Sequence, residues 1–595
     1  MKPNRRYLWC LLAVAAVALY WLIDRFVLPF DEVRRYGRLT GHFDWARQMP
    51  PGEWAWYAAL LLATGAALAL LLAWPRRHSD TPPPANPWRI VLALALLATV
   101  AAGAVRVSVL DSAAITDDEA AHLFAARTLA SGRLTAEPPP APEHFEHIFL
   151  GVYRGRWFSQ YLWGHALLLA LGVLVGLPGL ITALLAGVIV LGVFLLAREL
   201  FDERTGLAAA FLAAFSPLII STGATLASQT SATALVLLGL WLTLRATATG
   251  RFGHAFAAAL CLGFAFWCRQ QEPALLGLGA IILLVRRIVT GPGRARLLAG
   301  GALGSLLVVV PLVLIQWRLW DQPFWTNYQA YWWGYLKYPG VSPYGFGPAP
   351  WEGVHTPGGG LMATLINLTR LDMLLLGLPL TLVAAGVGLW RARRNRRAWA
   401  IFAGVPLTFG ALFFYFWPGL ADTGPHLYHA AGAVLLPFVA AGALALLDRF
   451  HRPLVALTVL ALAALLTVWP SHLGALHRAA RAADEIPRRI ASAGIDNAVV
   501  FTDLYPWAGG NERSWRLGSP LPRPNLSDSV LYLRTRGGKR DRDVAREVFP
   551  RRRAFMLKVV DGQLALLALE DYTGKESLRR VARPRNLPPR RSGLQ

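Results

Sequence analysis

The sequence is poor in cysteine, which limits the covalent and metal chemistry open to it. Only three of its 595 residues are cysteines, at Cys10, Cys261 and Cys268. Cys261 and Cys268 are seven positions apart in one expected helix, which separates them by roughly 10 Å, too far for a disulfide. The chain therefore has neither a disulfide framework nor the cysteine spacing of a zinc site.

Nucleotide-binding motifs are also missing. The chain contains no P-loop and no GxGxxG that follows a strand, the motifs that cradle phosphates through backbone N–H groups. Coupling to ATP is therefore not expected, and a nucleotide-sugar donor on the cytoplasmic side has no obvious binding site.

Charged residues are scarce as well, at 16% of the chain, whereas 55% is hydrophobic and the mean hydropathy is +0.41. This composition is too apolar for a soluble globular protein. A helix needs about 20 apolar residues to cross roughly 30 Å of hydrocarbon, and the chain has about thirteen such stretches. The composition and these apolar stretches therefore predict an all-α polytopic membrane protein. The expected spans are 7–28, 54–74, 88–109, 178–198, 206–222, 230–246, 254–268, 273–289, 297–317, 366–390, 398–417, 427–447 and 453–470.

The net charge of +24 follows membrane topology and does not form one patch suited to nucleic acid. Arginine pairs such as Arg76-Arg77 and Arg286-Arg287 fall at the same side of the expected spans, and that side is cytoplasmic by the positive-inside rule. With an odd number of spans, the amino terminus is inside and the C-terminal tail outside. The longer loops at 29–53, 110–177 and 318–365 are then outside as well.

The pattern predicts four regions. Two additional N-terminal spans occupy 1–87, a transmembrane core occupies 88–470, a small α/β domain outside the cytoplasm occupies 471–580, and the Arg- and Pro-rich stretch 581–595 is expected to be disordered. In the α/β domain, apolar runs predict strands and a hairpin turning at Asp561-Gly562. The expected elements are strands at 497–501 and 529–535, a helix at 541–548 and the hairpin Ala554–Glu570.

Three consecutive acids, Asp117, Asp118 and Glu119, open an amphipathic helix expected at 117–131, directly after a span, with Asp118 and His122 on its polar side. One explanation is local, because Thr116 and Glu119 have the spacing of a capping box and acids in a first turn complement the helix dipole. That explanation does not account for both aspartates. Clustered carboxylates raise one another's pKa, and a raised carboxylate pKa suits a general base that takes a proton from a hydroxyl.

Other polar groups are expected near the outer membrane surface. Arg269, which precedes Glu272, and Arg370, which precedes Asp372, either form structural ion pairs or hold a phosphate, because charge facing lipid is costly. His426 lies at an expected helix start, where free N–H groups bind anions, although a solvated histidine explains it nearly as well. The stretch 321–360 is rich in Tyr, Trp and Gly and forms either an interfacial belt or a binding loop.

Four segments in order give the chain a resemblance to the bacterial C-type glycosyltransferases, the polytopic enzymes related to protein O-mannosyltransferases and the lipid A aminoarabinose transferase. The resemblance covers roughly 90–470. The matching segments are Asp118-Glu119 for an Asp-Glu motif, Tyr161-x-x-Gly164-His165 for "YPPGH", His355-Thr356-Pro357 for "HTP" and Gly424-Pro425-His426-x-Tyr428 for "GPRYY".

The resemblance implies a GT-C fold and transfer of a sugar from a polyprenyl-phosphate-linked donor to an acceptor hydroxyl. Asp118 would be the base, with Asp117 competing for that role and Glu119 supporting it. Arg269, Arg370 and His426 would hold the donor phosphate, while His426-Leu427 and Leu162-Trp163 depart from the family motifs. The residues expected to contact substrate are His122, Tyr161, His165, His355 and Tyr428.

The expected partners are this donor, membrane lipids and a glycan, lipid or protein acceptor, in a bacterial inner membrane and with no nucleic acid. No cofactor is expected, and a divalent metal is an alternative that no ligand spacing supports. A polytopic transporter and a non-catalytic envelope assembly protein are the other functions considered. A transporter would need charged or broken helices near the bilayer midplane, whereas the polar residues here are at helix ends.

Overall fold

The structure is a computed structural model that describes residues 86–337, 344–349, 353–417, 423–448, 464–466, 468–502, 520–560 and 563–571. It divides into two compact units. The membrane unit comprises residues 1–112, 162–325 and 338–477, and the α/β unit comprises residues 113–161, 326–337 and 478–595. The expected spans 7–28 and 54–74, most of 453–470 and the tail 581–595 lie outside the described residues.

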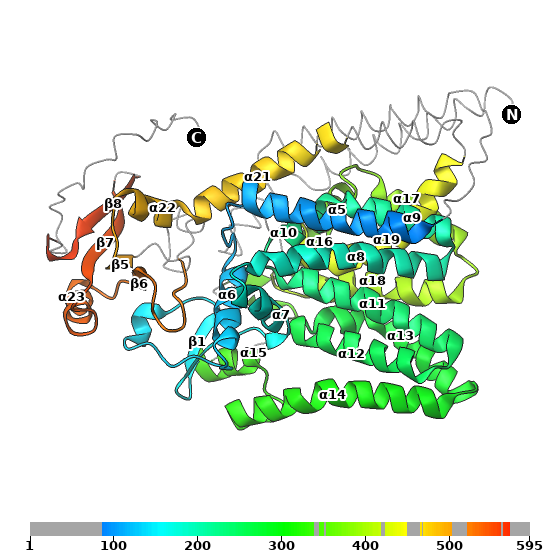
Figure 1. The fold of residues 1–595 in the computed structure, drawn as a ribbon, viewed down its shortest axis with the longest axis horizontal. Coiled ribbons are helices and arrows are strands. Elements are labelled where there is room, and N and C mark those ends of the chain that lie inside the picture. Colours follow the sequence, from blue (N-terminus) through cyan, green and yellow to red (C-terminus); the bar gives the residue numbers. More distant parts are fainter. Residues whose placement is uncertain are drawn as a thin grey trace. The chain divides into compact units, whose positions relative to one another are not determined.

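Long apolar helices form the membrane unit (Figure 1). Six of the described helices are long and apolar enough to cross a membrane, or seven if the bent pair α9 and α10 is one span. The chain is thus a multi-pass membrane protein, although thirteen spans are not confirmed. The helices are α5 (Pro87–Ser108), α7 (Trp163–Leu174), α8 (Pro178–Leu200), α9 (Glu203–Ala214), α10 (Pro217–Ala224), α11 (Ser228–Thr249), α12 (Phe252–Cys268), α13 (Gln271–Thr290), α14 (Arg294–Trp320), α16 (Pro357–Leu374), α17 (Thr381–Arg391), α18 (Arg396–Phe413) and α19 (His429–Leu447), and α21 (Val468–Ala483) leads into the α/β unit.

The expected span 206–222 is wrong in detail, because the chain breaks into α9 and α10 with a bend of 52°. Ser216 lies at the break, directly before Pro217, and a residue before proline is disfavoured in the α region. The Ser216 side chain then accepts a hydrogen bond from the backbone N–H of Ile219 at 3.3 Å, so it caps the new helix.

The expected span 366–390 is also wrong, because the chain leaves the helix after Leu374 and starts α17 at Thr381. Leu380 has a φ of 71°, a left-handed conformation that ends helical geometry. Asp372 accepts hydrogen bonds from the N–H groups of Leu380 at 2.8 Å and Leu382 at 2.7 Å. Asp372 therefore caps α17.

Glycines allow backbones in the membrane unit to touch. A Cβ added at Gly388 in α17 would lie 1.9 Å from the carbonyl oxygen of Phe438 in α19, and one added at Gly442 would lie 1.8 Å from that of Ala384. Such close approach through small residues is typical of membrane helix pairs.

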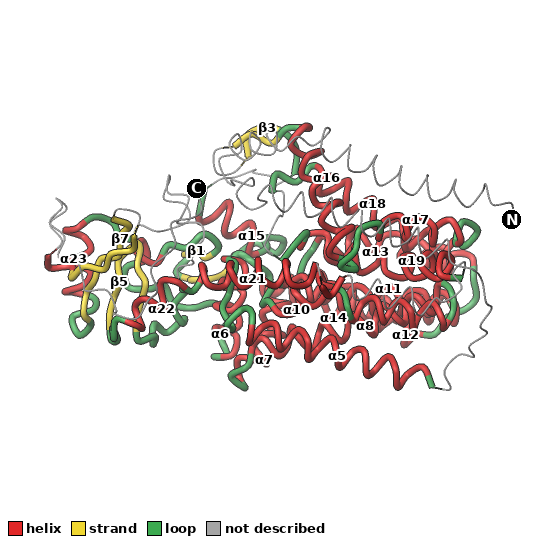
Figure 2. Tube along the Cα trace, turned by 90° about the horizontal axis from the view of Figure 1, so that it is seen from above, coloured by secondary structure: helices red, strands yellow, loops and turns green. Residues whose placement is uncertain are grey.

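The described parts of the aromatic stretch 321–360 contain helix and strand that the sequence does not predict. The stretch contains α15 (Asn327–Gln329) and the π-helix η3 (Ala330–Tyr335) in the α/β unit. In the membrane unit, strands β3 (Gly347–Ala349) and β4 (Gly353–His355) pair as an antiparallel hairpin that leads into α16 (Figure 2).

The α/β unit contains the predicted C-terminal strands in one four-stranded sheet, ordered β6-β5-β7-β8. β5 is parallel to β6 and β7, and β7 is antiparallel to β8, so the expected hairpin forms, with its turn outside the described residues. The elements are α6 (Asp117–Ala130), η2 (Pro142–Phe145), β1 (Leu150–Tyr153), β2 (Arg156–Ser159), α22 (Glu485–Ser492), β5 (Ala498–Thr502), β6 (Val530–Arg534), α23 (Gly538–Glu547), β7 (Arg553–Val560), β8 (Gln563–Ala568) and η6 (Leu569–Asp571).

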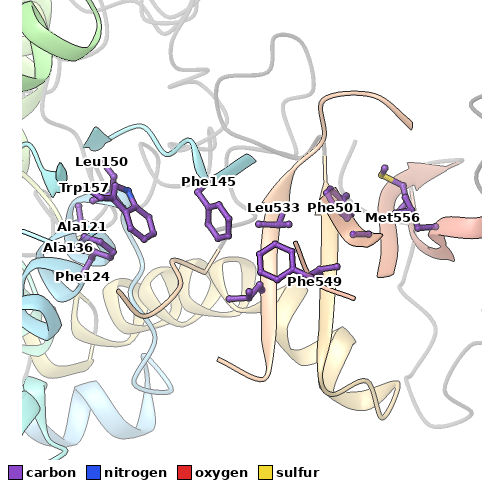
Figure 3. Close-up of a cluster of buried hydrophobic side chains, with 14 of the residues drawn as sticks. Ala121, Phe124, Ala136, Phe145, Leu150, Trp157, Phe501, Leu533, Phe549 and Met556 are labelled. Atoms are coloured by element: carbon purple, nitrogen blue, oxygen red, sulfur yellow. The ribbon is translucent and has the colours of Figure 1, made fainter. Parts of the chain in front are cut away.

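The two faces of the central strand β5 are buried against different parts of the chain, because neighbouring strand residues point to opposite faces. Val500 packs with Ile486 and Ile490 of α22. Val499 and Phe501 belong to a second buried cluster, the loop-facing core, which also takes in side chains from the loop 113–161. Figure 3 shows this cluster; its labelled members are Ala121, Phe124, Ala136, Phe145, Leu150, Trp157, Phe501, Leu533, Phe549 and Met556.

The loop 113–161 is therefore part of a folded unit with the C-terminal domain. Trp157 is 1% exposed, and its ring lies 4.6 Å from that of Phe124 and 6.0 Å from that of Phe145. Phe145 in turn lies 6.3 Å from Phe549, which follows α23 (Figure 3). The burial of these aromatic side chains ties the acidic helix to the sheet, because each buries a large apolar area.

Candidate active site

The acidic helix α6 begins where the sequence predicts. Thr116 has an extended backbone and its hydroxyl accepts from the N–H of Glu119 at 3.3 Å, while the same hydroxyl lies 3.2 Å from Oε1 of Glu119. Glu119 is fully buried. The capping explanation thus accounts for Thr116 and Glu119 but leaves Asp117 and Asp118 with other partners.

The buried face of α6 differs from the predicted one. His122 was expected on the polar side, yet it is 1% exposed, and Phe124 is equally buried. The His122 ring stacks on the ring of Tyr161 with centroids 4.4 Å apart. This burial arises because the loop folds onto the sheet, an arrangement that the helical periodicity alone does not predict.

Asp118 and Tyr161 form the central contact of the site. The Tyr161 hydroxyl donates a short hydrogen bond to Oδ1 of Asp118. Burial, followed by the negative charge of Asp118, raises the pKa of Tyr161 well above its usual value. The phenol therefore keeps its proton at neutral pH and acts as a donor to the carboxylate.

Tyr161 is itself held by the segment that follows α14. The side-chain amide of Asn327 donates to the carbonyl oxygens of Ser159 at 3.2 Å and Tyr161 at 2.8 Å. The Tyr328 ring lies 5.8 Å from the Tyr161 ring, nearly perpendicular to it. Helix α15, which is distant in sequence from Tyr161, thus fixes the phenol that faces Asp118.

Asp117 has a different partner, His147, which sequence reasoning missed. Nε2 of His147 lies 3.4 Å from Oδ1 of Asp117, and Nδ1 accepts a hydrogen bond from the N–H of Phe149 at 3.3 Å. Because Nδ1 is an acceptor, the neutral ring carries its proton on Nε2, which faces the carboxylate. The two adjacent aspartates therefore have different partners: Asp118 contacts a phenol, and Asp117 faces an imidazole.

A second polar cluster lies in the membrane unit around Arg269. Its guanidinium forms a short ion pair with Glu272 through Nε, and Nη1 donates to the hydroxyl of Ser228 at 3.3 Å. The predicted Arg269–Glu272 ion pair is therefore present. The Glu272 side chain is 3% exposed and that of Arg269 is 16% exposed. The ion pair thus allows both charges to be buried in an apolar part of the chain.

Two motif glycines bring further polar residues toward this cluster. A Cβ at Gly164 would lie 2.5 Å from the backbone of Trp267, so only glycine lets α7 start directly against the end of α12. At Gly424, φ is +101° and a Cβ would lie 2.5 Å from Leu374. Gly164 precedes His165, and Gly424 is two residues before His426.

The predicted phosphate residues lie within electrostatic range of one another. The positive charges of Arg269 and Arg370 both interact electrostatically with the ring of His426. The charge of Arg269 also interacts with the ring of His165. His165 has protein partners at both ring nitrogens, the Ser231 hydroxyl at 2.7 Å and the Leu226 carbonyl at 2.8 Å. Arg269, Arg370 and His426 thus share one basic region, whereas the contacts of His165 favour a structural role.

The last two predicted substrate residues pack against aromatic side chains of the membrane unit. Nε2 of His355 donates to the carbonyl oxygen of Phe413 at 3.2 Å, and its ring lies 5.2 Å from that of Phe346. Tyr428 is 2% exposed, with its ring 4.6 Å from that of Phe409. These contacts support packing roles.

Among the described residues, no set of three or more His, Cys, Asp or Glu side chains is arranged to hold a metal ion.

Comparison with solved structures identifies the fold. The chain is similar to ArnT from Cupriavidus metallidurans bound to undecaprenyl phosphate, with a TM-score of 0.51 and 14% identity over 82% of this chain and 98% of that one. The apo state of the same protein gives 0.51 and 13% over 81% and 98%. An oligosaccharyltransferase from Archaeoglobus fulgidus gives 0.41 and 13% over 73% and 65%. The chain therefore has the GT-C fold that its motifs predict.

A family comparison agrees with this fold. Residues 160–317 match the family described as dolichyl-phosphate-mannose-protein mannosyltransferase, which confirms the resemblance drawn from the motifs. The match begins just before Tyr161 and includes His165 and Arg269, whereas α6 and its acids precede it. No curated protein matches the chain.

Proposed function

We propose that this protein is a membrane glycosyltransferase that moves a sugar from a polyprenyl-phosphate-linked donor to an acceptor hydroxyl on the extracytoplasmic face of a bacterial inner membrane. The observation that carries the proposal is the hydrogen bond from Tyr161 to Asp118 at the start of α6. In a chain with the GT-C fold, it presents an oriented carboxylate that suits a general base.

In the proposed reaction, Asp118 takes the proton of the acceptor hydroxyl. The acceptor oxygen then forms a bond to the anomeric carbon, and the bond between that carbon and the phosphate oxygen breaks. Its electron pair leaves with the lipid phosphate, and the configuration at the anomeric carbon inverts. Asp117, with its partner His147, is the competing base, while Glu119 supports the helix start through Thr116.

The leaving phosphate gains negative charge as this bond breaks, so a nearby cation lowers the barrier. Arg269, Arg370 and His426 are our candidates because they share one basic region of the membrane unit. ArnT of Cupriavidus metallidurans was solved with undecaprenyl phosphate, and this supports a lipid phosphate as the ligand. A guanidinium also binds phosphate oxygens with two N–H donors at once.

The sugar and the class of acceptor, whether glycan, lipid or protein, are open within this proposal. The proposed chemistry uses no divalent metal, because a carboxylate base and arginines supply the charges that it needs. Transfer is then expected to proceed equally with and without EDTA.

The test is a transfer assay with the full chain in lipid vesicles. Polyprenyl-phosphate sugars labelled in the sugar are supplied together with glycan, lipid and protein acceptors, and the label is followed by mass spectrometry. Transfer supports the proposal if one lipid phosphate is released for each sugar attached. Movement of the sugar lipid across the membrane without cleavage would indicate a transporter, and neither event would favour an assembly role.

A further inference from the structure

We propose that Arg534 and Arg536 of the C-terminal domain are positioning residues that act through Glu146 on the acidic site, the start of α6 with Asp117 and Asp118. This inference rests on the proposed function for its catalytic consequence, and its structural part is measured separately. All of the contacts that carry it lie within the α/β unit.

Glu146 receives two arginines. Its Oε2 accepts from Nη1 of Arg534 at 2.5 Å and forms a short ion pair with Nη2 of Arg536. The three side chains are between 24% and 34% exposed. A partly buried carboxylate with two guanidinium partners has more defined geometry than a single exposed ion pair.

Arg536 also holds the backbone of the same segment. Its Nε and Nη2 donate to the carbonyl oxygen of Glu143 at 2.8 and 2.6 Å. The guanidinium thus bridges Glu143 and Glu146, and this forked geometry is one that lysine does not reproduce. We call residues 143–147 the clamp segment.

Consecutive side chains of the clamp segment point to different partners. His144 is 1% exposed, and its Nε2 lies 3.2 Å from Oδ1 of the fully buried Asp541. Phe145 enters the loop-facing core near Phe549 (Figure 3). With Glu146 on the arginines, three adjacent residues attach the segment to the C-terminal domain.

The fourth side chain reaches the acidic site. His147 follows Glu146 directly, and its Nε2 lies 3.4 Å from Asp117. On its other side, the Tyr331 hydroxyl donates a short hydrogen bond to the carbonyl oxygen of Ile148. One peptide unit therefore separates the arginine-bound residue from the one that faces Asp117, so a displacement of Glu146 moves His147 with it.

A purely stabilising role for the ion pairs predicts a different result. Loss of such a pair lowers the fraction of folded protein but leaves the turnover of each folded molecule unchanged. A positioning role lowers turnover per folded molecule, because misplacement of a reacting group by about 1 Å costs on the order of a hundredfold.

The experiment compares the full-length parent chain with Glu146→Gln, Arg536→Lys and the control Asp496→Asn. Asp496 pairs with Arg553 at 2.9 Å in a more exposed ion pair of the same unit. Turnover is divided by the number of sites that bind polyprenyl-phosphate sugar, a count that excludes unfolded protein. We expect kcat to fall at least tenfold in Glu146→Gln and Arg536→Lys, with donor affinity within twofold of the parent and with Asp496→Asn unchanged.

Hydrogen–deuterium exchange provides a second measurement that needs no activity. We expect exchange at residues 143–150 and 116–122 to rise at least fivefold in Glu146→Gln and not in Asp496→Asn. Parental turnover per site in Glu146→Gln, or parental exchange in both segments, would overturn the proposal. If the parent transfers no sugar to any acceptor, the proposed function fails, while the exchange measurement still decides whether the arginines hold the segment.

Discussion

The Tyr161 hydroxyl donates to Oδ1 of Asp118 across 43 positions of sequence. This contact joins the start of α6 to the residue that directly precedes Leu162, where the membrane unit resumes. It also assigns the two hydrogen-bonding roles, because the raised pKa of Tyr161 makes the phenol the donor and Asp118 the acceptor.

Tyr161→Phe removes this donor while keeping the ring that stacks on His122. A hydrogen bond to the ionised form of an acid stabilises that form and lowers its pKa, so its loss raises the pKa of Asp118. The base must be ionised to accept a proton. The acidic limb of the pH–rate profile is therefore expected to move to higher pH, and an unshifted limb would show that Asp118 is not the group that titrates.

Asp118→Asn keeps the volume and polarity of the side chain but removes the base. Transfer is expected to fall by about 10²–10⁴-fold, while donor binding is retained. Glu119→Gln is the comparison, because it disturbs the cap with Thr116 and is expected to cost roughly 1 kcal/mol of stability. Turnover and thermal unfolding are measured for both variants and for Asp117→Asn. Full activity in Asp118→Asn would rule out its role as the base.

Local signals predicted much of this fold. Apolar runs located α5, α8 and the helices from α11 to α14, and Thr116 with its acids marked the start of α6 within one residue. The break between α16 and α17 was missed because Gly377 and Pro379 lie within a continuous apolar run. A hydropathy window averages over such residues, whereas the backbone conformation depends on each of them.

The partners of the candidate site were much harder to predict. Glu146 and Arg534 are 388 positions apart, and residue spacing along one sequence informs only about neighbours on the same helix or strand. His147 carried only a weak signal, a histidine among acids in a loop. Burial of His122 likewise depends on the loop 113–161 packing against the C-terminal strands in the loop-facing core.

Membrane topology is tested with reporters that are active only on one side of the membrane. One is fused after Gln595 and another is inserted between Pro339 and Gly340. Both are expected to report an extracytoplasmic position, because the arginine pairs of the expected spans fall on the opposite side. A cytoplasmic signal from either one would contradict the proposed location of the reaction.

Asp541 is expected to contribute to stability above about pH 4 and to lose that contribution in acid. Burial alone would raise its pKa, but hydrogen bonds from His144, Thr535 and the Arg536 backbone outweigh burial and lower the pKa below its usual value. A depressed folded-state pKa means that stability falls as pH drops through it. Thermal unfolding from pH 6 to pH 3 should therefore show a shallower acid decline in Asp541→Asn than in the parent, and parallel curves would exclude this linkage.

Donor binding is tested at Arg269. Arg269→Ala is expected to weaken the affinity for a polyprenyl-phosphate sugar by about 1.5–3 kcal/mol, the loss of one charge-assisted hydrogen bond. The substitution also leaves the buried Glu272 without its ion-pair partner, so Arg269→Ala is paired with the double variant Arg269→Ala/Glu272→Gln, which removes that charge. Arg245→Ala serves as the control, because Arg245 contacts Glu199 at 3.5 Å in a more exposed ion pair of the same unit. If the double variant recovers parental affinity, Arg269 only neutralises Glu272 and the phosphate is bound elsewhere. If both variants lose affinity and Arg245→Ala does not, Arg269 contacts the phosphate.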